Sequence, residues 1–117
     1  MTPEGRIKKE IVDALTAMGI LAIRINSGRV AVRRGWLHLA PEGTADILVV
    51  VDGRPARVLG MEVKQPKGAR RPAQIAWGTS LVARGGFYAI VESLDEALSA
   101  IRAVRAAQAD DRKGDEP

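Results

Sequence analysis

The hydrophobic residues near the start of the chain recur at helical spacing. Apolar side chains return at every third or fourth position from Ile7 to Met18, which predicts an amphipathic helix with one buried face. Thr2 can cap this helix, Pro3 suits its first position and Gly19 favours its end. The chain is therefore expected to begin with a helix that packs against a core built by later segments.

The pattern then changes to short runs that are typical of strands. Residues 20–26 are rich in β-branched side chains, and two more short apolar runs follow at 29–33 and 35–40. Residues 41–65 indicate two strands joined through an Asp-Gly pair at 52–53, which strongly favours a hairpin. These runs predict a sheet with an antiparallel meander at its centre.

Helical spacing returns after a charged loop. Gln74, Trp77 and Leu81 lie on one face of a predicted helix, which should end at the glycine pair 85–86. The next segment, FYAIV at 87–91, has the composition of a strand. A second helix and a further strand are therefore expected here.

A third helix is expected near the C-terminus. Ser93 and Glu96 have the spacing of a capping box, and the helix that they open should run to about Ala107. Residues 109–117 hold too few apolar side chains to pack and are expected to form a disordered charged tail. Residues 1–108 then form one domain of the α/β class, with a mixed β-sheet flanked by helices.

Composition limits the size of the fold and its environment. A chain of 117 residues with 46% hydrophobic residues can bury one core and is too short for two. The absence of cysteine excludes disulfides and thiolate metal sites and fits a reducing compartment. The longest aliphatic run, at 47–51, is far too short to span a membrane. A soluble, cytoplasmic protein with no membrane partner is expected.

The charge balance points to a polyanionic partner. The net charge is +4, from 18 Lys and Arg against 14 Asp and Glu, and such an excess on a small domain favours nucleic acid. The basic residues gather in two clusters, Arg24, Arg29, Arg33 and Arg34, and then Lys64, Lys67, Arg70 and Arg71. The alternative is that each cluster is only a solvated face.

Charged residues also stand at the ends of the predicted central hairpin. Asp46 begins its first strand and Glu62 and Lys64 end its second, so antiparallel pairing can bring all three to one edge of the sheet. Two carboxylates suit Mg²⁺ or Mn²⁺, and a nearby ammonium can orient an attacking water or stabilise charge on a phosphate. The pattern favours metal-assisted phosphodiester hydrolysis, and its alternative is a cross-strand ion pair.

The segment GTADILVVVDGRPARVLGMEVKQPKGARRPAQIAW, residues 43–77, resembles the core of the virus-type replication-repair nuclease domain (VRR-NUC). This family is a branch of the PD-(D/E)xK, restriction-endonuclease-like superfamily. The resemblance implies a restriction-endonuclease-like fold, a site for Mg²⁺ or Mn²⁺, and cleavage of DNA, often at branched structures such as four-way junctions or flaps. A bacterial or phage-infected cell is the expected location, with viral, prophage and cellular origins all left open.

The resemblance assigns roles to the residues of the hairpin. Asp46, Glu62 and the main-chain carbonyl of Val63 would hold the metal, and Lys64 would be the catalytic cation. Ala45 departs from the family pattern, which usually has a proline there. Because that proline only stiffens the approach to the strand, little loss of activity is expected.

Two further residues are candidates for ordering the site. Glu10 lies at the rim of the apolar stripe of the first predicted helix, and the resemblance also supports a glutamate there; the alternative is an exposed helix side chain. Gln74 shares a helix face with apolar residues, which favours a role in the site; the alternative is a first-turn amide bonded to free backbone groups.

A polar turn and the basic clusters are the candidate DNA contacts. Donors in the turn Asn26-Ser27-Gly28 could hold a phosphate, although turn chemistry alone also explains these residues. The full set of predicted nucleic-acid contacts is Asn26, Ser27, Gly28, Arg29, Arg33, Arg34, Lys67, Arg70 and Arg71. With only four aromatic residues in the chain, base stacking cannot be the main mode of binding.

Residues 29–40, RVAVRRGWLHLA, favour a homodimer. Val30, Val32, Trp36 and Leu37 make this segment more apolar than a small domain can readily bury. The alternative is that its strands fold back over the monomer's own sheet. Trp36 and Trp77 are expected in the core and not as base-stacking platforms.

Together these features predict a metal-dependent DNA endonuclease. The alternative from another class is a non-catalytic nucleic-acid-binding module of the same fold, and metal-dependent cleavage separates the two. A protein of unrelated role with a cross-strand ion pair would show neither metal binding nor DNA affinity.

Overall fold

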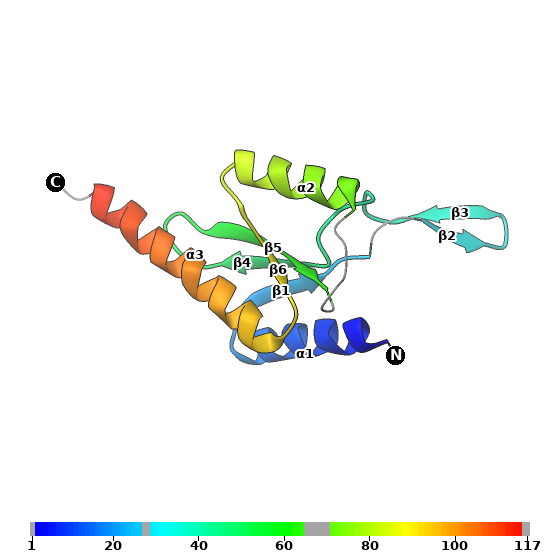
Figure 1. The fold of residues 1–117 in the computed structure, drawn as a ribbon, viewed down its shortest axis with the longest axis horizontal. Coiled ribbons are helices and arrows are strands. Elements are labelled where there is room, and N and C mark those ends of the chain that lie inside the picture. The colour runs from blue at the N-terminus through cyan, green and yellow to red at the C-terminus, as the bar shows by residue number, and fades with distance from the viewer. Residues whose placement is uncertain (1, 27–28, 65–70, 116–117) are drawn as a thin grey trace.

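The computed structural model describes residues 2–26, 29–64 and 71–115. Its elements follow the predicted order of helix, strands, helix, strand and helix (Figure 1). They are α1 Pro3–Ala17, β1 Leu21–Arg24, β2 Arg29–Val32, β3 Gly35–His38, β4 Ile47–Val51, β5 Arg57–Val63, α2 Pro72–Ala83, β6 Phe87–Val91 and α3 Leu94–Asp115. The predicted α/β class is confirmed.

Four strands form the main sheet, in the order β1-β4-β5-β6. Strand β4 pairs antiparallel with β1 and β5, whereas β6 runs parallel to β5, so the predicted mixed sheet and its antiparallel β4–β5 hairpin are confirmed. The expectation that the runs at 29–33 and 35–40 belong to the same sheet is wrong, because β2 and β3 pair only with each other. Ile47 lies opposite Met61 in the hairpin. Continued by one residue, this register places Asp46 opposite Glu62.

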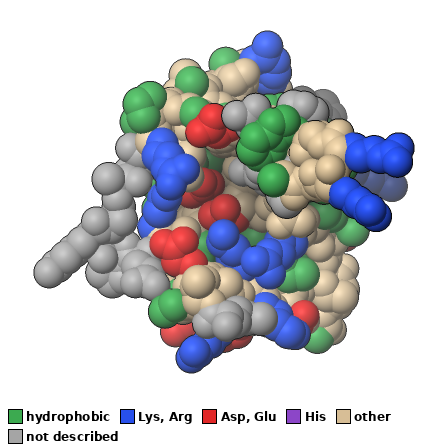
Figure 2. All heavy atoms as spheres, turned by 90° about the vertical axis from the view of Figure 1, so that its right-hand side faces the viewer, with side chains coloured by type: hydrophobic (Ala, Val, Ile, Leu, Met, Phe, Trp, Pro, Cys, Tyr) green, Lys and Arg blue, Asp and Glu red, His purple; other side chains and the backbone are tan. Residues whose placement is uncertain are grey.

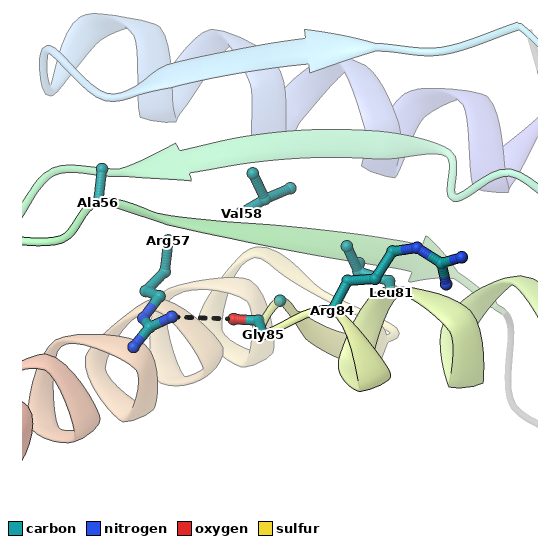
Figure 3. Close-up of a pocket in the computed structure, with 7 residues that line it drawn as sticks. Ala56, Arg57, Val58, Leu81, Arg84 and Gly85 are labelled. Atoms are coloured by element: carbon teal, nitrogen blue, oxygen red, sulfur yellow. Dashed lines mark hydrogen bonds between the residues drawn. The ribbon is translucent and has the colours of Figure 1, made fainter.

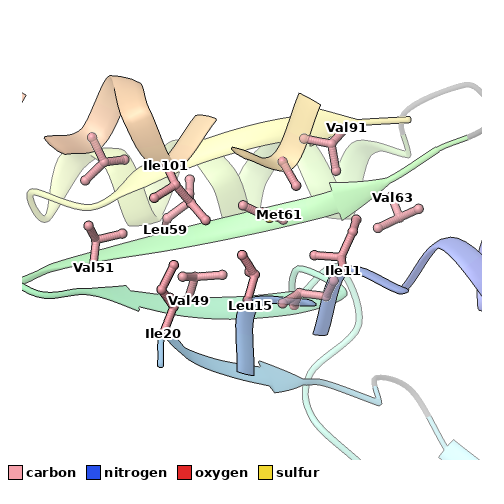
Figure 4. Packing of buried hydrophobic residues seen from close by; sticks show 13 residues of the cluster. Ile11, Leu15, Ile20, Val49, Val51, Leu59, Met61, Val63, Val91 and Ile101 are labelled. Atoms are coloured by element: carbon pink, nitrogen blue, oxygen red, sulfur yellow. The ribbon is translucent and has the colours of Figure 1, made fainter. Parts of the chain in front are cut away.

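Helices cover both faces of this sheet (Figure 1). On one face, Ile11 and Leu15 of α1 and Ile101 of α3 pack into the apolar core with the inward side chains of β4, β5 and β6 (Figure 4). On the other face α2 lies close to β5, because Gly60 has no side chain there. A Cβ at Gly60 would come within 2.8 Å of a ring carbon of Trp77. The domain therefore has three layers, with α2 alone on its side.

The sequence explains where α1 begins and which side it buries. Thr2 caps the helix, with its hydroxyl accepting the N–H of Gly5 at 3.0 Å. Ile11 and Leu15 are fully buried, as predicted. Met18 was expected in the same buried stripe and is 57% exposed, because the helix has already ended and Met18 is its C-cap.

Strands β2 and β3 form a separate two-stranded sheet that projects from one end of the domain (Figure 1). The molecule measures 60 × 27 × 26 Å, and this hairpin lies along its long axis. Val32, Trp36 and Leu37 are each about half exposed. The expectation that Trp36 belongs to the core is wrong, because the hairpin does not fold back over the main sheet.

The C-terminal helix is longer than predicted. α3 continues through Asp115, so the expectation of a disordered tail from residue 109 is wrong for residues 109–115. Two contacts hold this extension to the sheet. The Gln108 amide donates to the carbonyl of Val51 at 2.9 Å, and Asp111 pairs with Arg57 at 3.0 Å. No helix in the described ranges is long and apolar enough to cross a membrane.

Candidate active site

The start of β4 and the end of β5 meet at one edge of the main sheet. Oδ2 of Asp46 accepts the main-chain N–H of Val63 at 2.8 Å, which fixes the carboxylate against the end of β5. Because Asp46 and Glu62 lie opposite each other in the register, their side chains share one face of the sheet. The structure thus brings together the two carboxylates that the sequence predicts as metal ligands.

Glu62 is the unusual residue of this edge, because it is a carboxylate with only 1% of its surface exposed. Its Oε1 accepts a hydrogen bond from the side-chain amide of Gln74. Its Oε2 is also buried and has no hydrogen-bond partner among the described residues. A buried, unpaired carboxylate oxygen is costly, so it indicates a position built for a ligand.

Burial also changes the protonation of Glu62. Desolvation, and after it the neighbouring Asp46 carboxylate, raise the pKa of Glu62 from 4.5 to about 7, although Lys64 and Lys8 act in the opposite direction. Perturbed carboxylates of this kind are typical of functional sites.

This pKa predicts how pH changes the stability of the protein with a chelator present. Because the folded state holds the Glu62 proton more tightly than the unfolded chain does, its contribution is fully present below about pH 4.5 and is lost as pH rises through about 7. The loss should be on the order of 3 kcal/mol. Urea unfolding of wild type and Glu62→Gln between pH 4.5 and 8 measures it. Parallel pH profiles for the two proteins would contradict the prediction.

Gln74 makes both kinds of contact considered for it, one with a free backbone group at the start of α2 and one with a residue of the site. Pro72 opens α2, and Gln74 lies in its first turn, where its side-chain oxygen accepts the N–H of Arg71 at 3.1 Å. Its amide N–H₂ group meanwhile donates to Glu62. The Gln74 side chain therefore caps the N-terminal end of α2 and also orients a buried carboxylate of the site.

Lys8 of α1 reaches the same edge and was not predicted there. Its ammonium lies 3.2 Å from Oδ1 of Asp46, with both side chains about one-fifth exposed. The signal in the sequence was the spacing of Lys8 to Ile11 and Leu15, three and seven positions later, which places Lys8 on the buried stripe of α1.

The other two predicted site residues differ in their surroundings. Lys64 directly follows β5, is partly buried, and donates its main-chain N–H to Val91 at 3.0 Å. The positive charge of Lys64 acts to lower the pKa of Glu62, against the larger effects of burial and Asp46. Glu10 is exposed, and among the described residues it does not join Asp46 and Glu62 in a group of three that could hold a metal ion.

The predicted DNA contacts are only partly visible. Arg33 and Arg34 are exposed in the turn between β2 and β3, Asn26 is exposed after β1, and Arg71 is exposed before α2. Arg29 lies in β2. Ser27, Gly28, Lys67 and Arg70 lie outside the described residues. On the face that carries this end of the sheet, acidic and basic side chains lie next to each other near the centre, and further basic side chains project from the hairpin (Figure 2).

The residues at this edge fit a hard divalent cation. Oε2 of Glu62 is a buried oxygen without a partner, and Asp46 lies beside it. Among the described residues no group of three or more His, Cys, Asp or Glu side chains could hold a metal ion, so the protein would supply two carboxylates. That donor set suits Mg²⁺ or Mn²⁺, which keep several waters and also bind phosphate oxygens.

A small pocket lies at the opposite end of β5. It measures about 190 Å³, and Arg57, Arg84 and Gly85 are among the residues that line it (Figure 3). Arg57 donates to the carbonyl of Gly85 at 3.4 Å and pairs with Asp111. These contacts join the start of β5 to the turn after α2 and to α3, so the pocket is separate from the carboxylate edge.

The fold and this edge define an α/β protein of restriction-endonuclease-like architecture. A solved structure described as a VRR_NUC domain is similar to the chain, with a TM-score of 0.61 and 24% identity, covering 87% of this chain and 97% of the other. No protein-family model matches the chain, and no curated protein matches it. The resemblance seen in the sequence is therefore confirmed at the level of the fold, which is that of a VRR_NUC domain.

Proposed function

We propose that this protein is a divalent-metal-dependent nuclease that hydrolyses phosphodiester bonds in DNA. The observation that carries the proposal is the buried Glu62, whose Oε2 has no partner among the described residues and whose neighbour is the Asp46 carboxylate. The nuclease-like fold supports the same conclusion.

Each side chain of the edge has a distinct task in this reaction. Asp46 and Glu62, with the main-chain carbonyl of Val63, would hold Mg²⁺ or Mn²⁺, which supplies an activated water and neutralises phosphate charge when bound. Gln74 holds Oε1 of Glu62 and leaves Oε2 for the ligand. Lys64 would stabilise the negative charge that develops on the phosphate.

The direct test uses a panel of labelled four-way junctions, flaps and linear duplexes, each incubated with and without Mg²⁺ or Mn²⁺. Cleavage is expected only with the cation, and faster on branched DNA than on plain duplex. Binding without cleavage under all conditions would favour the non-catalytic module instead.

The exposed arginines of the hairpin turn predict a salt-dependent affinity for DNA. If Arg33 and Arg34 each neutralise a phosphate, the double Ala variant should flatten the slope of log K against log salt by about 0.9 for each residue. Arg102 and Arg105, which are exposed on α3 far from the hairpin, provide the matched double variant. Fluorescence anisotropy with uncut DNA measures the slopes. Equal slopes for both double variants would show that the hairpin is not part of the DNA interface.

We also propose that the working unit is a homodimer. A single site cuts one strand, and an isolated two-stranded hairpin is marginally stable in water, so the β2–β3 hairpin needs a surface to pack against. Val32 and Leu37 share one face of that hairpin by register and are 49% and 52% exposed. A second copy of the chain would cover them.

Light scattering at micromolar concentration tests the dimer. The expected mass is twice that of the 12.5 kDa chain, and Leu37→Asp should reduce it to the monomer mass. Val82→Asp is the matched control, because Val82 is 55% exposed on α2. A monomer mass for the wild type, retained with a junction bound, would exclude the paired cut.

A further inference from the structure

Lys8 is the residue of the carboxylate edge whose role the nuclease proposal leaves open. It comes from α1, whereas the candidate metal ligands come from the β4–β5 hairpin or from the residues next to it. Its ammonium lies 3.2 Å from Oδ1 of Asp46, and the other oxygen, Oδ2, accepts the N–H of Val63. Both oxygens of Asp46 are therefore engaged by protein donors.

A carboxylate oxygen that accepts one hydrogen bond keeps a lone pair for a metal ion, but a divalent cation bound at Oδ1 of Asp46 would lie close to the Lys8 ammonium and be repelled by it. The main-chain N–H of Val63 is fixed by the sheet and cannot move away. The lysine side chain is flexible and about one-fifth exposed, so it is the donor that can leave. We propose that Lys8 is a built-in competitor for Asp46, which a metal ion displaces and which thereby sets the metal affinity of the site.

The charge balance of the edge supports this inference, which rests on the proposed metal site. Two carboxylates, Asp46 and Glu62, face two ammonium groups, Lys8 and Lys64. A divalent cation entering this edge is attracted by the first pair and repelled by the second. Loss of the Lys8 charge leaves the edge with one more uncompensated negative charge and should strengthen cation binding.

The chain offers a close control on the same helix. Lys9 pairs with Asp13 at 2.5 Å, but both side chains are about three-fifths exposed and the pair lies on the solvent side of α1. Lys8 and Lys9 therefore differ by one position in sequence and by their distance from the carboxylate edge. A substitution at either removes the same charge from the same helix.

Calorimetric titration with Mn²⁺, without DNA and at pH 8, tests the inference on wild type, Lys8→Met, Lys8→Gln and Lys9→Met. Lys8→Met and Lys8→Gln should each bind Mn²⁺ roughly fivefold more tightly or better, since the cation no longer displaces a partly buried ion pair. Lys9→Met should match the wild type. Circular dichroism of each variant verifies that α1 remains folded.

A second experiment measures the thermal stability of the same proteins with and without Mn²⁺. The increase in Tm on adding Mn²⁺ should be larger for Lys8→Met than for wild type and Lys9→Met. Equal Mn²⁺ affinities for wild type and both Lys8 variants would overturn the role of Lys8 and leave the metal site standing. Absence of Mn²⁺ binding in every protein would overturn both the metal site and this inference.

Discussion

Glu62→Gln should abolish DNA cleavage while the protein stays folded. Gln is close in shape to the protonated side chain and can keep the contact with Gln74, so packing around this buried position is preserved. It cannot supply the anionic oxygen that a hard cation requires, so the variant should also lose Mn²⁺ binding. Cleavage of a labelled junction and calorimetric titration measure the two losses.

Asp46→Asn is expected to behave in the same way, because it removes the second carboxylate. Asp52→Asn is the matched control, since Asp52 is an exposed carboxylate at the opposite end of β4. Wild-type cleavage by Glu62→Gln would show that the reaction occurs elsewhere on the protein.

The central hairpin could be predicted because its signals are local. The Asp-Gly pair and the β-branched runs define two strands, and antiparallel pairing brings Asp46 and Glu62 to one edge of the sheet, as the observed register shows. Gln74 follows from helical spacing, because an amide among apolar residues must find a polar partner. For these residues, local rules and the final structure agree.

The way α1 meets the sheet could not be read from the sequence. Lys8 and Glu10 both flank its apolar stripe, and only the rotation and height of the docked helix decide which of them reaches the edge. The sequence favours Glu10 as the site residue of this helix, whereas the structure brings Lys8 to Asp46. Helical periodicity gives the direction of a buried face to within a residue or two, and a site depends on finer placement.

Long-range contacts also explain the errors at α3 and at the β2–β3 hairpin. The charged composition of residues 109–115 gives no sign of the Arg57–Asp111 pair, which joins positions 54 residues apart. Trp36 was assigned to the core because it is apolar, but a hairpin that projects from the domain exposes it. Composition indicates whether a side chain favours burial or solvent, but tertiary contacts decide its actual surroundings.

Lys64→Met should separate metal binding from chemistry. Lys64 follows β5 directly and its positive charge lowers the pKa of Glu62, so the ammonium acts on that carboxylate without being a metal ligand itself. Loss of a cation that stabilises charge in the transition state should reduce the cleavage rate on the order of 10²- to 10³-fold. Single-turnover cleavage of a saturating labelled junction measures this step without a contribution from weaker DNA binding.

Mn²⁺ binding by Lys64→Met should be retained or strengthened, because a positive charge has been removed and both carboxylates remain. This result would distinguish Lys64 from Glu62 and Asp46, whose variants lose binding and cleavage together. Lys9→Met, which removes the exposed ammonium of α1 that pairs with Asp13, should cleave at the wild-type rate. If Lys64→Met also cleaves at that rate, the ammonium takes no part in the reaction and the charge stabilisation must come from another group at this edge.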